Sequence, residues 1–337
     1  MKNNIRFIEE MPKVELHVHI EGAVSPDTYW HLAEKNRVKL PVESLHEWKD
    51  FFKFKSFAHF IDVYILAVST IKKPEDYKTI IKDFFRYQKS QNIVYTEAFL
   101  SASFMIESFN QEELLHNIKE ALIEGENEYC VEVRLIPDIA RNVPESADAV
   151  VDFVTNGFKE GVFIGLGLGG LEQGYLAEKF VKQFQRAGEA GLNLVAHAGE
   201  GVGAESVLSA IENLNAQRIG HGIRVLENDS VVSLAKEIQI PFEVCPNSNY
   251  RLKIVPENEN HPIAEMIKQG LLCTLNSDDP LMFSTSLIGE YKLLLAQGLD
   301  LQTLIQLNKN TINSSFLTDV EKIELNSKFD RFIDEFK

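Results

Sequence analysis

Short β-rich apolar segments alternate with helical stretches along most of the chain, and this alternation restricts the possible folds more than any other feature. From the second segment on, successive segments begin 22 to 38 residues apart, about the length of one β-α-β crossover unit. Crossovers of this kind join parallel strands, and eight strands in 337 residues favour an α/β barrel, (β/α)8, over an open doubly wound sheet. The predicted strands begin at Val14, Ile93, Val131, Val162, Leu192, Arg218, Ile240 and Leu271.

The interval between the first two predicted strands is much longer than the others and must hold additional structure. Its apolar residues at helical spacing are Phe57, Phe60, Ile61, Tyr64, Ile65 and Val68. We therefore expect a (β/α)8 TIM barrel with extra helices inserted after the first strand, covering the barrel mouth. An aromatic cluster in this insertion suits a helix core face, and it equally suits an apolar lid that excludes water from a bound substrate. The cluster comprises Phe51, Phe52, Phe54, Phe57 and Phe60.

Helix ends are recognisable at several places. Gly191 suits the C-cap of a helix over Lys179–Ala190, and Thr318 with Glu321 forms a capping-box pattern at the start of the last helix. No repeat, low-complexity tract or Pro/Ser-rich linker marks a boundary, so residues 1–337 are predicted to form a single domain. Other predicted helices span Pro74–Gln91, Ser206–Asn213, Ser230–Glu237 and His261–Gln269.

The charge balance excludes several classes of partner. The formal net charge of −16 opposes general attraction to phosphate backbones and anionic lipid, so we expect neither a nucleic-acid polymer nor a membrane as partner. No segment reaches the roughly 20 apolar residues of a membrane helix, and the polar start of the chain lacks the apolar core of a secretory signal. We expect a cytoplasmic protein that acts on a small molecule. The cysteines, predicted to be small core residues of a reduced protein, are Cys130, Cys245 and Cys273.

Histidine or aspartate closes four of the predicted strands. The carboxyl ends of barrel strands meet at one mouth, which is where active sites form in this architecture. Any one of these residues alone would more often be a buried structural residue, but four strand ends of the same kind predict a common site. The residues are His17 and His19 on the first strand, His197 on the fifth, His221 on the sixth, and Asp278 and Asp279 on the eighth.

The composition of this predicted site suits zinc. Zn²⁺ takes nitrogen and oxygen ligands and leaves a position for water, whose pKa it lowers toward neutrality. Glu200, one helical turn past His197, can deliver a proton to the substrate, while His221 and Asp279 can orient the attacking water. We expect one zinc ion per chain, and its expected ligands are His17, His19, His197 and Asp278.

Five segments, in order and with matching spacing, resemble the motifs of the adenosine deaminase family. They are Met11–His19, His197–Glu200, Arg218–Gly222, Cys245–Asn249 and Asn276–Pro280, and with their flanks they cover the chain from Met11 to about Tyr291.

The resemblance implies a role for each predicted site residue. The zinc ligands would be those expected above, Glu200 would protonate purine N1, and His221 would position the attacking hydroxide. Asp279 would bond purine N7, and the backbone at Gly170 would face N3. Attack at C6 would then expel ammonia without a covalent enzyme intermediate.

Two departures from the family pattern leave the substrate open. Glu21 stands where adenosine-specific members usually have aspartate near the ribose, and relatives acting on free adenine or on 5′-modified nucleosides such as aminodeoxyfutalosine tend to carry glutamate there. The segment Gly167–Glu172 lacks the acidic residues that often flank its glycine. Its spacing matches no phosphate-binding loop, and its glycines suit the approach of a flat ring to the backbone.

The segment Asp278–Ser284 resembles the adenosine-specific branch. The expected reaction is therefore deamination of adenosine or 2′-deoxyadenosine to inosine or 2′-deoxyinosine, with an adenine deaminase or a deaminase of a 5′-modified adenosine as the alternative. A catalytically inactive zinc-binding partner protein would keep the ligands and lose the acid, yet Glu200, His221 and Asp279 are all present. Two-metal hydrolases on related barrels often use a bridging lysine, whereas these residues surround one metal.

Overall fold

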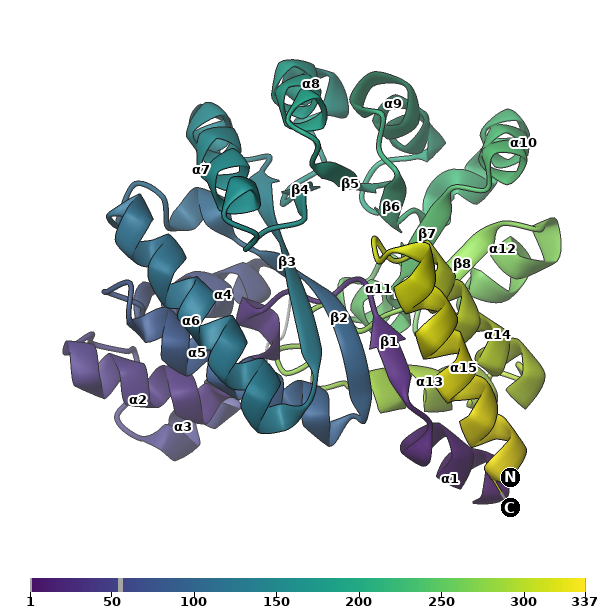
Figure 1. The fold of residues 1–337 in the computed structure, drawn as a ribbon, viewed down its shortest axis with the longest axis horizontal. Coiled ribbons are helices and arrows are strands. Elements are labelled where there is room, and N and C mark those ends of the chain that lie inside the picture. Colours follow the sequence, from purple (N-terminus) through teal and green to yellow (C-terminus); the bar gives the residue numbers. More distant parts are fainter. Residues whose placement is uncertain (1, 54–56, 337) are drawn as a thin grey trace.

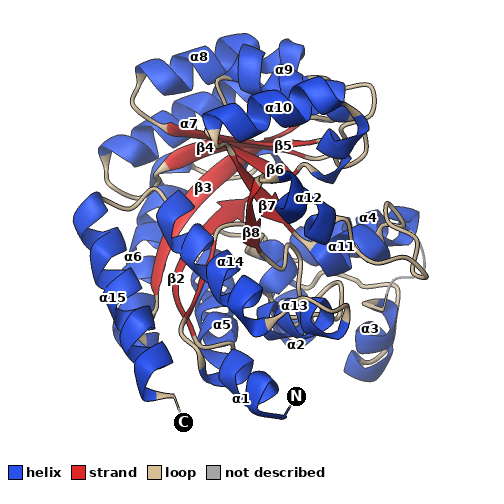
Figure 2. Cartoon of the chain, turned by 90° about the vertical axis from the view of Figure 1, so that its right-hand side faces the viewer, coloured by secondary structure: helices blue, strands red, loops and turns tan. Residues whose placement is uncertain are grey.

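The computed structural model describes the chain except residues 1, 54–56 and 337. Eight strands form one sheet in sequence order, and each neighbouring pair in that order is parallel. Helices surround this sheet on the outside (Figures 1 and 2). The strands are β1 Lys13–Glu15, β2 Ile93–Leu100, β3 Glu132–Ala140, β4 Gly165–Gly169, β5 Asn193–Ala198, β6 Arg218–His221, β7 Pro241–Val244 and β8 Leu272–Leu275.

The barrel closes just beyond β1 and β8. The backbone N–H of Asp278 donates to the carbonyl of His17 at 3.0 Å, and the N–H of His19 donates to the carbonyl of Asp278 at 2.8 Å. On the other side, the N–H of Phe99 in β2 donates to the carbonyl of Val18 at 2.8 Å. The predicted (β/α)8 barrel is confirmed. β1 itself ends at Glu15, so the two histidines follow the regular strand, and these backbone bonds hold them in its extension.

The fifteen helices of the described residues include all those predicted. The final helix opens with the expected capping box, in which the Thr318 and Glu321 side chains each accept the other residue's N–H. The helices are α1 Lys2–Glu10, α2 Pro26–Asn36, α3 Leu45–Phe51, α4 Phe57–Ser69, α5 Asp76–Ser90, α6 Gln111–Tyr129, α7 Ala147–Lys159, α8 Val181–Glu189, α9 Ala204–Leu214, α10 Asp229–Ile238, α11 Pro246–Arg251, α12 Ile263–Gln269, α13 Leu287–Ala296, α14 Leu301–Ser314 and α15 Asp319–Glu335. Five short 3-10 helices are η1 Glu21–Ala23, η2 Ala102–Phe104, η3 Pro144–Ser146, η4 Ala177–Phe180 and η5 Ile223–Glu227.

The long interval between β1 and β2 holds α2, α3 and α4 before the crossover helix α5, as predicted. Phe52 and Phe60 are buried, and the Phe60 ring packs on Phe283 with centroids 5.0 Å apart. Since Phe283 follows β8, the insertion after β1 contacts the segment that follows the last strand of the barrel. The core role predicted for Phe52 and Phe60 is confirmed. Phe54 and the Phe57 side chain lie outside the described part of the chain.

Both ends of the chain lie at the same end of the molecule (Figure 1). There, the ring of Phe7 in α1 packs against Phe332 in α15 with centroids 5.2 Å apart. Cys245 and Cys273 are buried as predicted, whereas the prediction for Cys130 is wrong: it is exposed because it ends α6 in the left-handed conformation, with φ of 56°. Among the described residues, no helix combines the length and apolar character needed to cross a membrane.

Candidate active site

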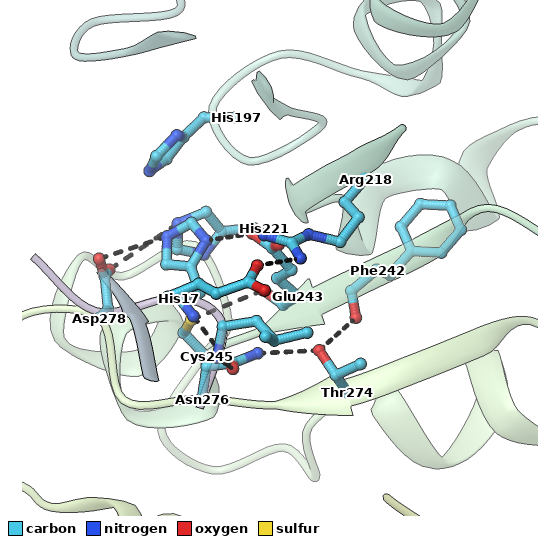
Figure 3. Close-up of polar contacts among 12 residues, drawn as sticks. His17, His197, Arg218, His221, Phe242, Glu243, Cys245, Thr274, Asn276 and Asp278 are labelled. Carbon is cyan, nitrogen blue, oxygen red and sulfur yellow. Dashed lines mark hydrogen bonds and ion pairs between the residues drawn. The ribbon is translucent and has the colours of Figure 1, made fainter. Parts of the chain in front are cut away.

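The four expected metal ligands converge at the carboxyl end of the barrel, although they come from strands far apart in the sequence. His19 Nε2 lies 3.3 Å from His197 Nε2 and 3.4 Å from Asp278 Oδ1. His17 Nε2 lies 3.6 Å from the same carboxylate oxygen, and Figure 3 shows the His17 side chain beside Asp278. One donor atom from each residue fits within a group whose members are at most 4.8 Å apart.

The environment of these donors fits a cation. Two imidazole Nε2 atoms 3.3 Å apart cannot satisfy each other when both are unprotonated, and His17 Nε2 is buried without a hydrogen-bond partner among the described residues. Burial lowers the pKa of His19 to about 4 and that of His197 well below its usual value, so both rings are neutral and keep a lone pair for a metal. Neutral imidazoles with a carboxylate form a donor set that zinc prefers.

A second set of donors shares His17 and Asp278 and adds His221 and Cys245. Burial raises the pKa of the Cys245 thiol well above its usual value, and the nearby carboxylates raise it further. Because a metal binds the thiolate rather than the thiol, this second set is the poorer one. The set of three histidines and one aspartate therefore fits a metal better.

The outer nitrogens of two of these histidines are held by fixed acceptors. His197 Nδ1 donates to the carbonyl of Leu168 at 2.9 Å, and His17 Nδ1 donates to Glu243 Oε2 at 2.8 Å. Each bond fixes the ring so that its Nε2 points toward the common centre. Burial opposes a charge on His17, but the carboxylates of Asp278 and Glu243 outweigh burial and raise its pKa to about 10. The centre thus stabilises positive charge.

A buried ion-pair chain supports Glu243 from behind. Arg218 Nε lies 2.6 Å from Glu243 Oε1, and the Arg218 guanidinium also pairs with Glu97 (Figure 3 shows the first contact). All three side chains are at most 1% exposed, and the guanidinium lies 3.8 Å from the centre of the Phe316 ring. Neither Glu97 nor Glu243 was predicted from the sequence. In the sequence, each of them stood out only as a charged residue inside a short apolar strand.

Glu200 lies in the loop between β5 and α9, so its predicted place on a helical turn is wrong. The loop is organised by Glu172, a buried carboxylate that stood out in the sequence only as part of the glycine-rich segment. Glu172 accepts four successive backbone N–H groups, and one of them is that of Glu200, at 3.2 Å. Burial, and then the charges of Asp278 and Glu172, raise the pKa of Glu200 to about 8. Glu200 therefore holds a proton near neutral pH.

His221 faces the same centre. Its Nε2 lies 3.6 Å from Glu200 Oε1 and 3.8 Å from Asp278 Oδ2. Burial lowers the pKa of His221 to about 3, so the ring is neutral. Both His221 and Asp278 have positive φ, 59° and 64°, which is costly for residues other than glycine and occurs where the surrounding structure enforces it.

Glu21 is the first residue of η1, and Asp279 packs against the next residue of η1, Gly22. Gly22 permits this packing, since a Cβ there would lie 1.8 Å from Asp279 Oδ1. Glu21 Oε1 accepts the N–H of Ser101 at 3.1 Å, while its Oε2 and Asp279 Oδ1 are buried without a hydrogen-bond partner among the described residues. Burial raises the pKa of Glu21 to about 7. Burial, then the charge of Asp278, raises that of Asp279 well above its usual value.

Gly170 follows β4 in the left-handed region, with φ of 79°. A Cβ at Gly170 would lie 2.6 Å from Asn142 Oδ1, and one at Gly169 would lie 2.6 Å from Asp138 Oδ2. Asp138, near the end of β3, is only 4% exposed. Burial, then the charge of Glu21, raises its pKa to about 8. This carboxyl was not predicted from the sequence, because it lies within an apolar strand.

Comparisons with known proteins agree with this architecture. The family model described as adenosine deaminase matches residues 12–332. An aminodeoxyfutalosine deaminase from Streptomyces coelicolor is 35% identical, over 97% of this chain and 85% of its own. The solved structure of an adenine deaminase from Arthrobacter aurescens matches with a TM-score of 0.90 at 30% identity, over 96% of this chain and 99% of its own.

A zinc-containing structure is also similar. It is an amidohydrolase from Burkholderia ambifaria, solved with bound zinc, that matches with a TM-score of 0.89 at 25% identity, over 100% of this chain and 95% of its own. The matches extend over nearly the whole chain, and the barrel is the one that the motifs predicted. The chain therefore belongs to the adenosine deaminase family and is a hydrolase that acts on carbon–nitrogen bonds.

Proposed function

We propose that this protein is a zinc-dependent hydrolase that removes the exocyclic amino group of a 6-aminopurine, and that its substrate is free adenine. The buried carboxyl of Asp138 beside the glycine-rich end of β4 is the observation that favours the free base. Relatives named adenine deaminase and aminodeoxyfutalosine deaminase support a 6-aminopurine substrate. They favour the alternative substrates over the adenosine that the sequence motifs led us to expect.

Zinc would be held by the three imidazoles and the carboxylate that converge at the barrel mouth. When bound, it would lower the pKa of water and so supply a nucleophile near neutral pH. The zinc in a similar solved structure supports this choice of metal. The four ligands are His17, His19, His197 and Asp278.

The other site residues would handle the protons and the orientation of the ring. Glu200 would deliver its proton to purine N1, which makes C6 more electrophilic, and its raised pKa keeps that proton available near neutral pH. Asp279 would stay protonated and donate to purine N7, which is an acceptor. His221, neutral and beside Glu200, would orient the attacking water.

Free adenine differs from its nucleosides at one edge of the ring. N3 accepts a hydrogen bond, and the neighbouring N9 carries a hydrogen only in the free base. By the family resemblance Gly170 faces N3, and the adjacent Gly169 is the residue that Asp138 approaches. A protonated carboxyl offers one donor and one acceptor, so Asp138 would complement N3 and N9–H together. In a nucleoside, the sugar on N9 removes that donor.

A 5′-modified adenosine is the second candidate substrate. Glu21 has one carboxyl oxygen without a partner among the described residues, and a sugar hydroxyl would satisfy it. The relative named aminodeoxyfutalosine deaminase supports this reading. Adenosine itself would use the same contact, so the two carboxyls, Asp138 and Glu21, separate the free base from the nucleosides.

The test offers adenine, adenosine, 2′-deoxyadenosine and a 5′-modified adenosine to the zinc-loaded protein and follows ammonia release. Turnover should fall about 10²-fold or more in Glu200→Gln. Asp138→Asn keeps one donor and one acceptor and should retain adenine turnover, whereas the similarly sized Asp138→Leu should lower kcat/KM for adenine about 10- to 100-fold.

Each outcome assigns the substrate. Preferred turnover of adenine, lost in Asp138→Leu, supports the proposal. Preferred turnover of the 5′-modified compound, unaffected by Asp138→Leu, moves the assignment to the second candidate. No turnover of any of the four compounds by zinc-loaded protein would overturn the deaminase proposal.

A further inference from the structure

A chain of hydrogen bonds runs from the back of the His221 ring to a backbone amide at the start of α12. The N–H of Ile263 donates to His261 Nδ1 at 3.2 Å. His261 Nε2 lies 3.0 Å from Asn249 Oδ1, and Asn249 Nδ2 lies 3.3 Å from His221 Nδ1. The three side chains are at most 2% exposed, so water does not compete for these bonds.

The backbone amide sets the direction of every bond in this chain. An N–H group can only donate, so His261 Nδ1 must be the accepting nitrogen of its ring. The hydrogen of His261 therefore lies on Nε2, which donates to the amide oxygen of Asn249. This leaves the amide NH2 group of Asn249 facing His221, whose Nδ1 must accept. The hydrogen of a neutral His221 ring is consequently on Nε2.

The reverse arrangement conflicts with that same amide. A hydrogen on His221 Nδ1 would require Asn249 to turn its oxygen toward His221 and its NH2 group toward His261. His261 would then have to accept at Nε2 and carry its hydrogen on Nδ1, directly opposite the N–H of Ile263. Two facing donors in a buried site leave an N–H group without an acceptor, which is unfavourable.

We propose that Asn249 and His261 are positioning residues that hold His221 in the tautomer with its hydrogen on Nε2. His221 then presents a donor to the reacting centre, 3.6 Å from Glu200 Oε1 and 3.8 Å from Asp278 Oδ2. A donor of this kind can hold the oxygen of the attacking water but cannot take its proton. His221 is thereby an orienting group and not a base. The catalytic part of this inference rests on the proposed deaminase function, while the tautomer itself does not.

Burial lowers the pKa of His261 to about 3, so its ring carries a single hydrogen near neutral pH, consistent with this chain of hydrogen bonds. In the sequence, Asn249 stood in a family motif without a role, and His261 was recognised only as the start of a helix. His261 is in neither group of potential metal ligands found among the described residues.

The first measurement is of the ring nitrogens themselves. Zinc-loaded protein labelled with ¹⁵N-histidine is studied by long-range ¹H–¹⁵N correlation, and the His221 signals are assigned by their loss in His221→Gln. We expect hydrogen on His221 Nε2 and a lone pair on Nδ1. Hydrogen on Nδ1 in the unaltered protein would overturn the proposal, whatever its substrate proves to be.

Variants then test this relay, which is the chain of hydrogen bonds from the Ile263 amide through His261 and Asn249 to His221. Asn249→Asp gives both rings an acceptor, so hydrogen should appear on His221 Nδ1 and kcat should fall about 10²-fold or more, with a smaller change in KM. His261→Phe removes the donor and should also lower kcat, whereas His261→Gln keeps an N–H toward Asn249 and should restore most of it. Asn258→Asp makes the same charge change at an exposed position nearby and is the control.

The variants also separate this inference from the proposed function. If no 6-aminopurine is turned over, the ring-nitrogen signals of the Asn249 and His261 variants still decide whether the relay sets the tautomer. If Asn249→Asp fails to fold, the comparison of His261→Phe with His261→Gln replaces it. A tautomer and a kcat that stay unchanged in His261→Phe would refute the positioning role.

Discussion

Replacement of Glu172 by glutamine should loosen the loop that carries Glu200. The Glu172 carboxylate has one oxygen that accepts three donors and another that accepts two, and burial leaves it 5% exposed. A carboxamide has only one acceptor oxygen, so it cannot satisfy both groups. The donors are the backbone N–H groups of Gly199, Glu200, Gly201 and Val202 and the hydroxyl of Ser206.

The size of the effect follows from the bonds that are weakened. In the better orientation of the new carboxamide, three N–H bonds remain but lose their charged partner, and the Ser206 hydroxyl turns to accept from the new NH2 group. The N–H of Gly199 is then left unsatisfied, at about 1–3 kcal/mol. Since bonds to charged groups contribute about 1 kcal/mol more than neutral ones and water reaches part of this loop, we expect a loss of about 3 kcal/mol in the free energy of unfolding.

Urea unfolding and ammonia release together measure this change. The unfolding midpoint of Glu172→Gln should fall, and kcat should fall more than KM rises, because the displaced Glu200 serves the reaction step. Glu178→Gln is the control, since Glu178 is exposed and, among the described residues, accepts a hydrogen bond from the Ser209 hydroxyl alone, at 2.7 Å. It should change stability by less than about 0.5 kcal/mol. An unchanged midpoint and an unchanged kcat in Glu172→Gln would refute the reasoning.

Three further predictions concern the remaining parts of the site. Glu200 must be protonated to act as an acid, and its pKa is raised to about 8, so kcat should decline as the pH rises through that value. A kcat that still increases with pH in this range would contradict the role of Glu200. Arg218→Met removes the guanidinium that the buried carboxylates of Glu97 and Glu243 share, and calorimetry should show a destabilisation of about 3–5 kcal/mol, or the ion pair is not the support we describe. Gly22→Ala places a Cβ 1.8 Å from Asp279 Oδ1. It should raise KM for the purine with a stability cost of about 1–3 kcal/mol, and an unchanged KM would exclude Asp279 from the substrate site.

The sequence was sufficient for the barrel and for the residues at its mouth. Strand and helix periodicities are local, so each strand start was predicted to within three residues, as for Val162 against the observed Gly165. Because parallel strands deliver their carboxyl ends to one edge, residues such as His197 and Asp278 could be grouped from strand order alone. Glu21 likewise raised the question of the substrate from its position in the chain.

The supports behind those residues were decided only by the tertiary structure. Glu243 meets His17 across 226 residues of sequence, and Arg218 meets Glu97 across 121. Such pairs leave no local pattern in the sequence. The residues around a charged side chain in an apolar strand can be the same whether that side chain contacts water or a buried residue of opposite charge. The relay through His261 is similarly hidden, since its direction depends on one backbone amide that only the fold brings within 3.2 Å. Periodicity and strand order determine where side chains emerge, and packing alone determines which donor each one meets.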